Sequence, residues 1–206
     1  MTESQASKTL AVELEHRETL LDSFLRIDRL RLRHQLFAGG WSDTMTRELL
    51  LRPRAVGVLL FDPTRDQVVL VRQIRIGMLD EGMDPWLIEL VAGMVEAGEE
   101  PIDVAARESL EEANATPRAL VQICEYYNSP GISNERITLF CGCVDASLAG
   151  GVFGLEDEHE DIEVVVLERE AALELVASGK INNAMSIIAL QWLQLNRDEL
   201  ERRWAQ

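Results

Sequence analysis

The chain has 206 residues, of which 47% are hydrophobic and 27% are charged, so it is long enough for a globular domain with a sizeable core. Its formal net charge of −16 argues against binding to nucleic acid, because a polyanion would be repelled. The longest apolar runs, such as residues 56–61, are much shorter than a membrane span. We therefore expect a protein without nucleic-acid or membrane partners.

Two features of the sequence indicate the cellular compartment of the protein. Charged residues at positions 13–18 interrupt any apolar segment of a secretory signal. The three cysteines, Cys124, Cys141 and Cys143, form no CxxC pair. A disulfide between any two of them would leave the third unpaired. Both features favour a reducing cytoplasm.

The N-terminal region alternates charged and apolar residues from about residue 9 to residue 54, most clearly over residues 24–33. A period of two predicts antiparallel strands. We expect a small β region, residues 1–53, before a main domain, residues 54–206. A sheet of that size is hard to stabilise alone, so burial of its apolar face in a homodimer is expected.

The main domain mixes strand and helix patterns. Apolar runs predict strands at residues 55–61, 67–76, 86–92, 120–127, 137–144 and 162–167. Helical patterns cover residues 101–113, 169–178 and 185–204, and Pro101 suits a first helical turn. The domain is therefore of the α/β class.

Acidic residues gather in two stretches. Residues 93–115 hold seven acids and one base, and residues 155–163 hold six acids and no Lys or Arg. Mutual repulsion between the carboxylates is relieved either by full solvation or by bound cations. Solvation is the commoner explanation for a lone acidic run, but the acids of the first stretch are also regularly spaced.

That spacing is helical. At 100° per residue, one arc of the predicted helix carries mostly small residues: Ile102, Ala105, Ala106, Ser109 and Ala113. The opposite arc carries Glu108, Glu111 and Glu112. Like charges at these spacings each cost about 0.2–0.5 kcal/mol, so something outside the helix should compensate. Adjacent carboxylates suit a hard divalent cation such as Mg²⁺.

These residues resemble the Nudix box, the helix-containing motif of the Nudix hydrolases: Gly93, Glu99, Arg107-Glu108 and Glu111-Glu112 stand at its spacing. The motif's usual final glycine is Asn114 here, and Asn is the next-best residue for a left-handed helix end. The resemblance implies an α/β/α sandwich with a mixed sheet. The small N-terminal antiparallel β domain would extend from it.

The resemblance also implies a metal site. Glu108, Glu111 and Glu112 would bind Mg²⁺, with Mn²⁺ as the alternative ion, together with the backbone carbonyl of Ala92. Arg107 would hold a carboxylate in place, and Glu99 would cap the loop electrostatically.

Further stretches, residues 33–37, 73–75, 91–94, 129–131 and 189–193, resemble the bacterial ADP-ribose pyrophosphatase subfamily. This implies a Mg²⁺-dependent enzyme that hydrolyses ADP-ribose to AMP and ribose 5-phosphate. One alternative is another sugar-nucleotide pyrophosphatase of the GDP-mannose type, because such relatives share much of the framework. A second is a non-catalytic Nudix-fold module that binds ADP-ribose. Such modules usually have a degraded box, whereas every charged position is present here.

The second acidic stretch matches the family's mobile catalytic loop. By resemblance Glu158 is the expected general base, and Glu160 is the alternative base or an additional metal ligand. For the phosphates the resemblance selects Arg75, with Met94 nearby.

The remaining substrate contacts are also carried over by resemblance. Arg47 and Arg52 would reach the phosphates from the partner of a homodimer, and Phe24 and Leu25 would contact adenine across it. Phe24 in an alternating strand could equally be a core residue. The terminal ribose is assigned to Ser129 and Glu135.

Overall fold

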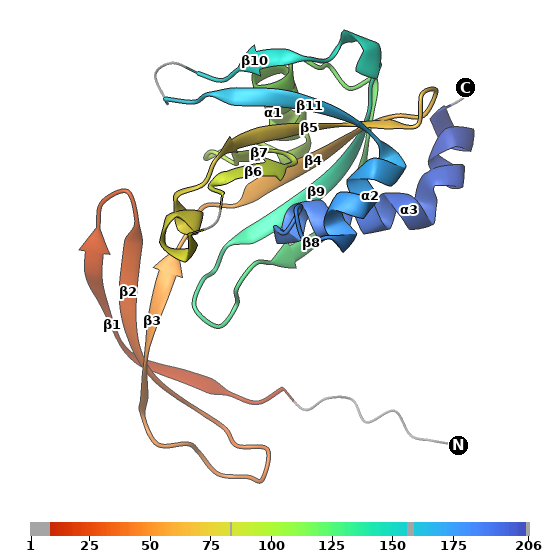
Figure 1. The fold of residues 1–206 in the computed structure, drawn as a ribbon. Helices are drawn as coiled ribbons and strands as arrows, with labels where there is room; N and C mark the ends of the chain where they lie inside the picture. Colours follow the sequence, from red (N-terminus) through yellow and green to blue (C-terminus); the bar gives the residue numbers. More distant parts are fainter. Residues whose placement is uncertain (1–8, 83, 156–158, 205–206) are drawn as a thin grey trace, which may run out of the picture. The chain divides into compact units, whose positions relative to one another are not determined.

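The computed structural model describes residues 9–82, 84–155 and 159–204 (Figure 1). The described chain divides into two compact units. The first runs to Arg52 and also contains residues 127–135; the second contains residues 53–126 and 136–206. The sequence analysis did not assign the segment 127–135 to the N-terminal region.

The first unit is built on a three-stranded antiparallel sheet in the order β1-β2-β3. Its strands are β1 (Val12–Asp22), β2 (Arg26–His34) and β3 (Met45–Leu51). Alternating charged and apolar residues thus form the antiparallel strands that the pattern predicts. Asp28, fully buried in β2, accepts hydrogen bonds from Arg17 and Thr19 of β1.

Phe24 is not a core residue of this sheet. It lies in the turn between β1 and β2 and is 87% exposed. The strand pattern was wrong at this position because the chain reverses there, with Ser23 N–H donating to the Leu25 carbonyl.

The second unit holds an eight-stranded mixed sheet. Its strands are β4 (Ala55–Asp62), β5 (Gln67–Ile74), β6 (Trp86–Glu89), β7 (Val91–Met94), β8 (Ala119–Tyr127), β9 (Arg136–Cys143), β10 (Gly151–Phe153) and β11 (Ile162–Glu168). The main order is β10-β11-β5-β4-β9-β8, with β6 paired to β5 and β7 paired to β4. Strand β4 runs parallel to β9 and antiparallel to β5 and β7.

Helices cover both faces of this sheet, which gives the expected α/β/α sandwich (Figure 1). On one face α1 (Pro101–Ala113) packs Val104 and Ala105 against alternate residues of β4 and β5 such as Val58 and Val71. On the other face lie α2 (Arg169–Ala177) and α3 (Ala184–Trp204), with Leu190 packed near Leu70. Burial of these two apolar layers holds the sheet between the helices.

Helix α1 begins and ends where the sequence predicts. Pro101 occupies its first turn, where a missing N–H costs nothing. Asn114 ends it in the left-handed conformation, φ 47° and ψ 35°; its N–H donates to the carbonyl of Leu110, and the N–H of Ala115 donates to that of Ser109. Asparagine thus serves at the position of the motif's usual glycine.

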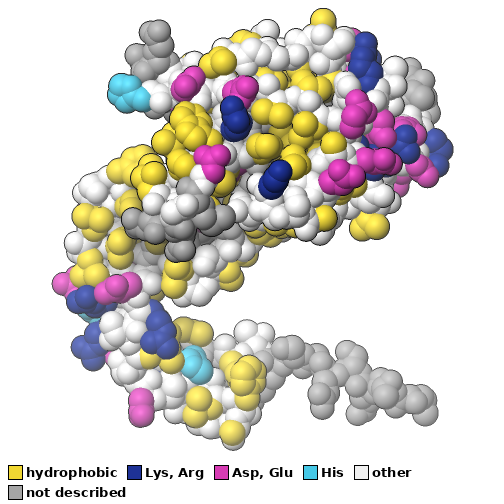
Figure 2. Space-filling model, in the orientation of Figure 1, with side chains coloured by type: hydrophobic (Ala, Val, Ile, Leu, Met, Phe, Trp, Pro, Cys, Tyr) yellow, Lys and Arg dark blue, Asp and Glu magenta, His cyan; other side chains and the backbone are white. Residues whose placement is uncertain are grey.

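Acidic and basic side chains lie next to one another on the larger unit around the C-terminal part of α3 (Figure 2). Arg197 contributes to this with ion pairs to Asp66 at 3.2 Å and to Glu201 at 2.8 Å. None of the helices in the described ranges combines the length and apolar character needed to cross a membrane.

Candidate active site

The face of α1 that meets the sheet differs from the predicted arc. Ala105, Ser109 and Ala113 are buried as predicted, but Ile102 and Ala106 are exposed. Glu112, expected on the arc opposite these small residues, is only 3% exposed. The helix turns this carboxylate inward because Oε2 of Glu112 accepts the backbone N–H of Ala92 on β7, at 3.0 Å.

Glu108 fits against β7 where a side chain is missing. A Cβ atom built on Gly93 would lie 1.7 Å from Oε1 of Glu108. Only glycine leaves room for the carboxylate at this strand residue. The glycine that begins the motif therefore makes room for Glu108, one of the acids near the end of the motif.

Arg107 connects three of the motif's carboxylates. Its Nη1 donates to Glu108 and to Glu111, each at 2.9 Å, and its Nε lies 3.4 Å from Glu99. Glu99 in turn accepts the backbone N–H of Glu96, at 2.9 Å. The guanidinium thus offsets the repulsion that the spacing of these acids creates.

Two of the carboxylates have strongly raised pKa values. Burial raises the pKa of Glu112 to about 8, against the effect of the Ala92 N–H and with the help of the charges on Glu108 and Glu160. Burial likewise raises the pKa of Glu108 to about 7, with Arg107 opposing and Glu111 adding to the shift. Such perturbed carboxyl groups, gathered beside glycine, are typical of a functional site.

Glu160 belongs to the same electrostatic group, since its charge acts on both Glu108 and Glu112. Its own Oε2 accepts the backbone N–H of Leu155 at 3.1 Å. Glu158, the expected base, lies outside the described residues. Glu108, Glu112 and Glu160, three of the predicted acids, are therefore near enough for their charges to interact.

Arg75 lies beside this group. It is held by a buried acid that the sequence analysis passed over: its Nε is 2.5 Å from Oε2 of Glu89, which is 4% exposed. The available signal was a single charge inside the apolar run 86–92. Met94, assigned to the phosphates with Arg75, is half exposed at the end of β7.

The other predicted substrate residues belong to the first unit. Arg52 and Glu135 are brought together there, with Nε 3.5 Å from Oε1, and Glu135 also accepts a hydrogen bond from Asn128. The Ser129 carbonyl accepts the N–H of Ser133 in the same segment. Arg47 donates to the carbonyl of its neighbour Thr46, and Leu25 is partly buried next to Phe24.

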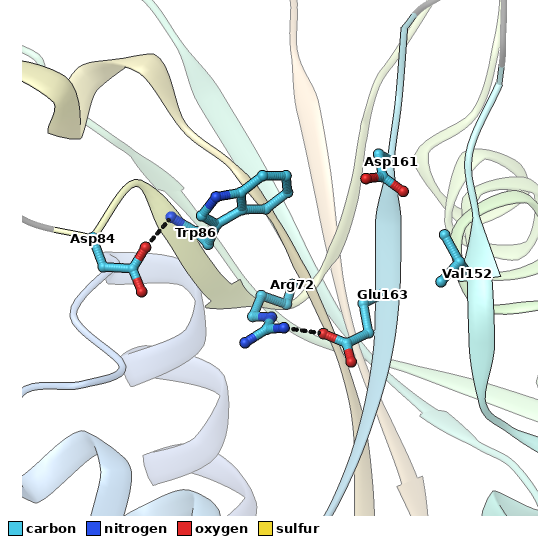
Figure 3. A pocket seen from close by; sticks show the side chains of 6 residues that line it. All are labelled: Arg72, Asp84, Trp86, Val152, Asp161 and Glu163. Atoms are coloured by element: carbon cyan, nitrogen blue, oxygen red, sulfur yellow. Dashed lines mark hydrogen bonds and ion pairs between the residues drawn. The ribbon is translucent and has the colours of Figure 1, made fainter.

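A separate cavity of about 330 Å³ opens in the second unit (Figure 3). It is lined by Arg72, Asp84, Trp86, Val152, Asp161 and Glu163. Arg72 alternates with Val68 and Leu70 on β5, so it lies on the face of the sheet opposite α1. None of the selected site residues that the structure describes lines this cavity.

The acids of α1 and Glu160 offer only oxygen donors, the ligands that Mg²⁺ and Mn²⁺ prefer. The two raised pKa values mark acids with too little positive charge around them, which a bound cation would supply. Within the described ranges, however, no group of three or more acidic, His or Cys side chains is already gathered closely enough to hold a metal ion. A cation would therefore displace existing partners such as Arg107.

Comparison with known proteins shows the family of this chain. The model of the NUDIX domain matches residues 51–184, so the chain belongs to the Nudix family. Members of this family generally use divalent metal ions. The matched range contains α1, β7 and the loop before β11.

Two individual relatives show how much of this chain is similar to known enzymes. The chain is 45% identical to the ADP-ribose pyrophosphatase of Haemophilus influenzae, over 99% of this chain and 95% of that protein. It is 38% identical to the GDP-mannose pyrophosphatase of Cronobacter sakazakii, over 72% of this chain and 78% of that protein. The first similarity extends over the N-terminal unit as well as the Nudix domain.

A solved structure described as an ADP compounds hydrolase has the same fold. It superposes with a TM-score of 0.67 over 91% of this chain and 97% of its own, at 18% identity. This likeness confirms the α/β/α architecture with its additional antiparallel sheet.

Proposed function

We propose that this chain is an ADP-ribose pyrophosphatase that cleaves the diphosphate of ADP-ribose to give AMP and ribose 5-phosphate, with Mg²⁺ as its metal. The observation that carries the proposal is that Glu108 fits beside Gly93 and interacts electrostatically with Glu112 and Glu160, while the charge of Arg75 acts on Glu112. High identity to an ADP-ribose pyrophosphatase over nearly the whole chain supports this substrate over GDP-mannose.

Different residues of the protein neutralise the two charges of the diphosphate and activate the attacking water. Glu108, Glu111 and Glu112, with the carbonyl of Ala92, would hold Mg²⁺. When bound, the ion neutralises the diphosphate and lowers the pKa of a water molecule. Arg75 contributes a cation of the protein's own to the phosphates. Glu158 or Glu160 removes the proton from the water that attacks phosphorus.

The remaining substrate contacts are proposed from the family resemblance. Arg47 and Arg52 come from the partner of a homodimer, and the exposed ring of Phe24, with Leu25, stacks on adenine across it. Ser129 and Glu135 contact the terminal ribose. We also propose a cytoplasmic location, which the three unbridged cysteines support.

A substrate panel tests the function. The protein is incubated with Mg²⁺ and ADP-ribose, GDP-mannose, NADH or a diadenosine phosphate, and the products are separated by chromatography. Dominant release of AMP and ribose 5-phosphate from ADP-ribose supports the proposal. Dominant cleavage of GDP-mannose contradicts it, and so does tight ADP-ribose binding without turnover of any substrate.

Alanine substitutions separate the two candidate bases. Loss of the base lowers turnover by about 10²–10⁴-fold with little change in the Mg²⁺ requirement. Loss of a metal ligand moves the Mg²⁺ dependence to higher concentration. We expect the first pattern for Glu158→Ala and the second for Glu160→Ala.

A further inference from the structure

Glu89 is a buried acid on the α1 face of the sheet. It lies opposite Val71 in the antiparallel pair of β5 and β6. Cross-strand partners share a face, and the Val71 side chain packs in the apolar layer under α1. The Glu89 carboxylate therefore points to the same side as Glu108 and Glu112, although no part of the Nudix box includes it.

Arg75 reaches this carboxylate from the end of β5. Its backbone is extended, with φ −128° and ψ 109°, so its side chain keeps to the face of Val71. Oε2 of Glu89 holds the Nε edge of the guanidinium at 2.5 Å. Among the described residues the guanidinium donates only through Nε, which leaves both Nη groups for another acceptor.

The guanidinium held in this way lies close to the carboxylate helix. Its charge is one of those that act on Glu112, where it lowers the pKa against the effect of burial. Glu89 itself is 6% exposed at its side chain, whereas the Arg75 side chain is 41% exposed. The acid is thus the fixed partner, and the arginine is the one that faces outward.

We propose that Glu89 is a positioning residue, which aims the Nη edge of Arg75 at the diphosphate of the substrate; this rests on the proposed function. A flexible arginine at a strand end loses side-chain entropy when it binds phosphate, and an existing Nε bond removes part of that cost. A buried carboxylate also binds its one counter-charge tightly, because an unpaired buried charge is costly.

The same strand carries a matched control. Arg72 pairs with Glu163 at 2.6 Å, on the opposite face of the sheet and in the separate cavity (Figure 3). Both side chains of that pair are about half exposed. The chemistry is the same, but the pair does not face α1, so breaking it should leave the reaction unchanged.

A double-mutant cycle tests the proposal in the full-length protein. The kcat/KM for ADP-ribose is measured with saturating Mg²⁺ for Glu89→Gln, Arg75→Ala and the double variant. We expect Glu89→Gln to lower kcat/KM by about tenfold or more, mainly through KM, and Arg75→Ala to lower it further. If Glu89 acts only through Arg75, the double variant equals Arg75→Ala alone. Additive losses, or no loss in Glu89→Gln, overturn the proposal.

Two further measurements keep the result interpretable. Glu163→Gln should keep kcat/KM within about twofold of the wild type. If Glu89→Gln does not fold, as judged by its thermal transition, Arg75→Lys replaces it, because lysine has no Nε edge for Glu89 while still facing phosphate. A kcat/KM equal to wild type in Arg75→Lys then overturns the role of Glu89, and a loss of about tenfold supports it.

The wild-type panel separates the two hypotheses. Failure of the wild-type protein to cleave ADP-ribose contradicts the proposed function before any variant is made. An active wild-type enzyme with an additive cycle contradicts only the positioning role of Glu89.

Discussion

The carboxylate of Glu108 occupies the space that a side chain at position 93 would fill, with Oε1 only 1.7 Å from where a Cβ of Gly93 would stand. A helix residue and a strand residue fifteen positions apart are thereby fitted to each other. Glu108 can adopt this position only because residue 93 has no side chain.

Gly93→Ala should therefore displace Glu108 and weaken the metal site. We expect kcat to fall by at least about 10²-fold and the Mg²⁺ concentration for half-maximal activity to rise. Gly77→Ala is the control, since a Cβ there meets nothing within 4 Å. Activity of Gly93→Ala equal to that of Gly77→Ala would contradict the fit described here.

Glu112→Gln should separate stability from metal binding. The amide keeps an oxygen that can accept the Ala92 N–H and removes a buried charge, so the metal-free protein should melt at the same temperature or higher. The rise in Tm that Mg²⁺ causes in the wild type should be largely lost. Differential scanning calorimetry with and without Mg²⁺ measures both effects, and an unchanged Mg²⁺-induced rise would exclude Glu112 as a ligand.

The stability of the metal-free protein should fall as pH rises. In the folded state the pKa values of Glu108 and Glu112 are raised to about 7 and about 8, so folding favours their protonated forms. This stabilisation is complete below the ordinary glutamate pKa and is lost as pH rises through about 7 and 8. Urea denaturation with a chelator at about pH 5.5 and about pH 8.5 should show the decrease, and Glu112→Gln should reduce it.

Added Mg²⁺ should act in the opposite direction. Because the ion binds the ionised carboxylates, the stabilisation it gives should grow over the same pH range. Equal Mg²⁺ stabilisation at both pH values would contradict the involvement of these two groups.

The end of α1 offers a test of backbone geometry. Asn114 has φ 47°, in the left-handed region that asparagine and glycine tolerate. Asn114→Gly should change the free energy of unfolding little, whereas Asn114→Val should lower it by about 1–2 kcal/mol. Chemical denaturation of the two variants measures the difference, and equal stabilities would show that the helix end relaxes.

Much of this architecture could be predicted because its signals are local. Pro101 and Asn114 set the limits of α1, and alternation predicts antiparallel strands in the N-terminal region, though not where each begins and ends. Strand β10 was missed, since three residues, Gly151–Phe153, are too few to show a period. The run 86–92 was taken as one strand because nothing in its sequence shows that β6 pairs with β5 and β7 with β4.

Site residues inside the Nudix box could be predicted from its spacing. Contacts that arise from the pairing of strands were harder to predict. Helical periodicity placed Glu112 on the arc opposite the small residues, but it does not reveal that the carboxylate turns inward to accept the Ala92 N–H. Glu89 and Arg75 lie fourteen positions apart and meet only through the pairing of β5 with β6. The roles of Glu158, Arg47, Arg52, Phe24, Leu25, Ser129 and Glu135 stay predictions.

The bonds from Arg107 to Glu108 and Glu111 have a consequence for the catalytic cycle. A guanidinium cannot leave with the products, whereas a solvated ion can. In the metal-free protein the arginine supplies a resident counterion to these acids, so α1 would not need to loosen if a bound cation left between turnovers. A cation bound here could then return to solvent while the site kept its shape for the next one.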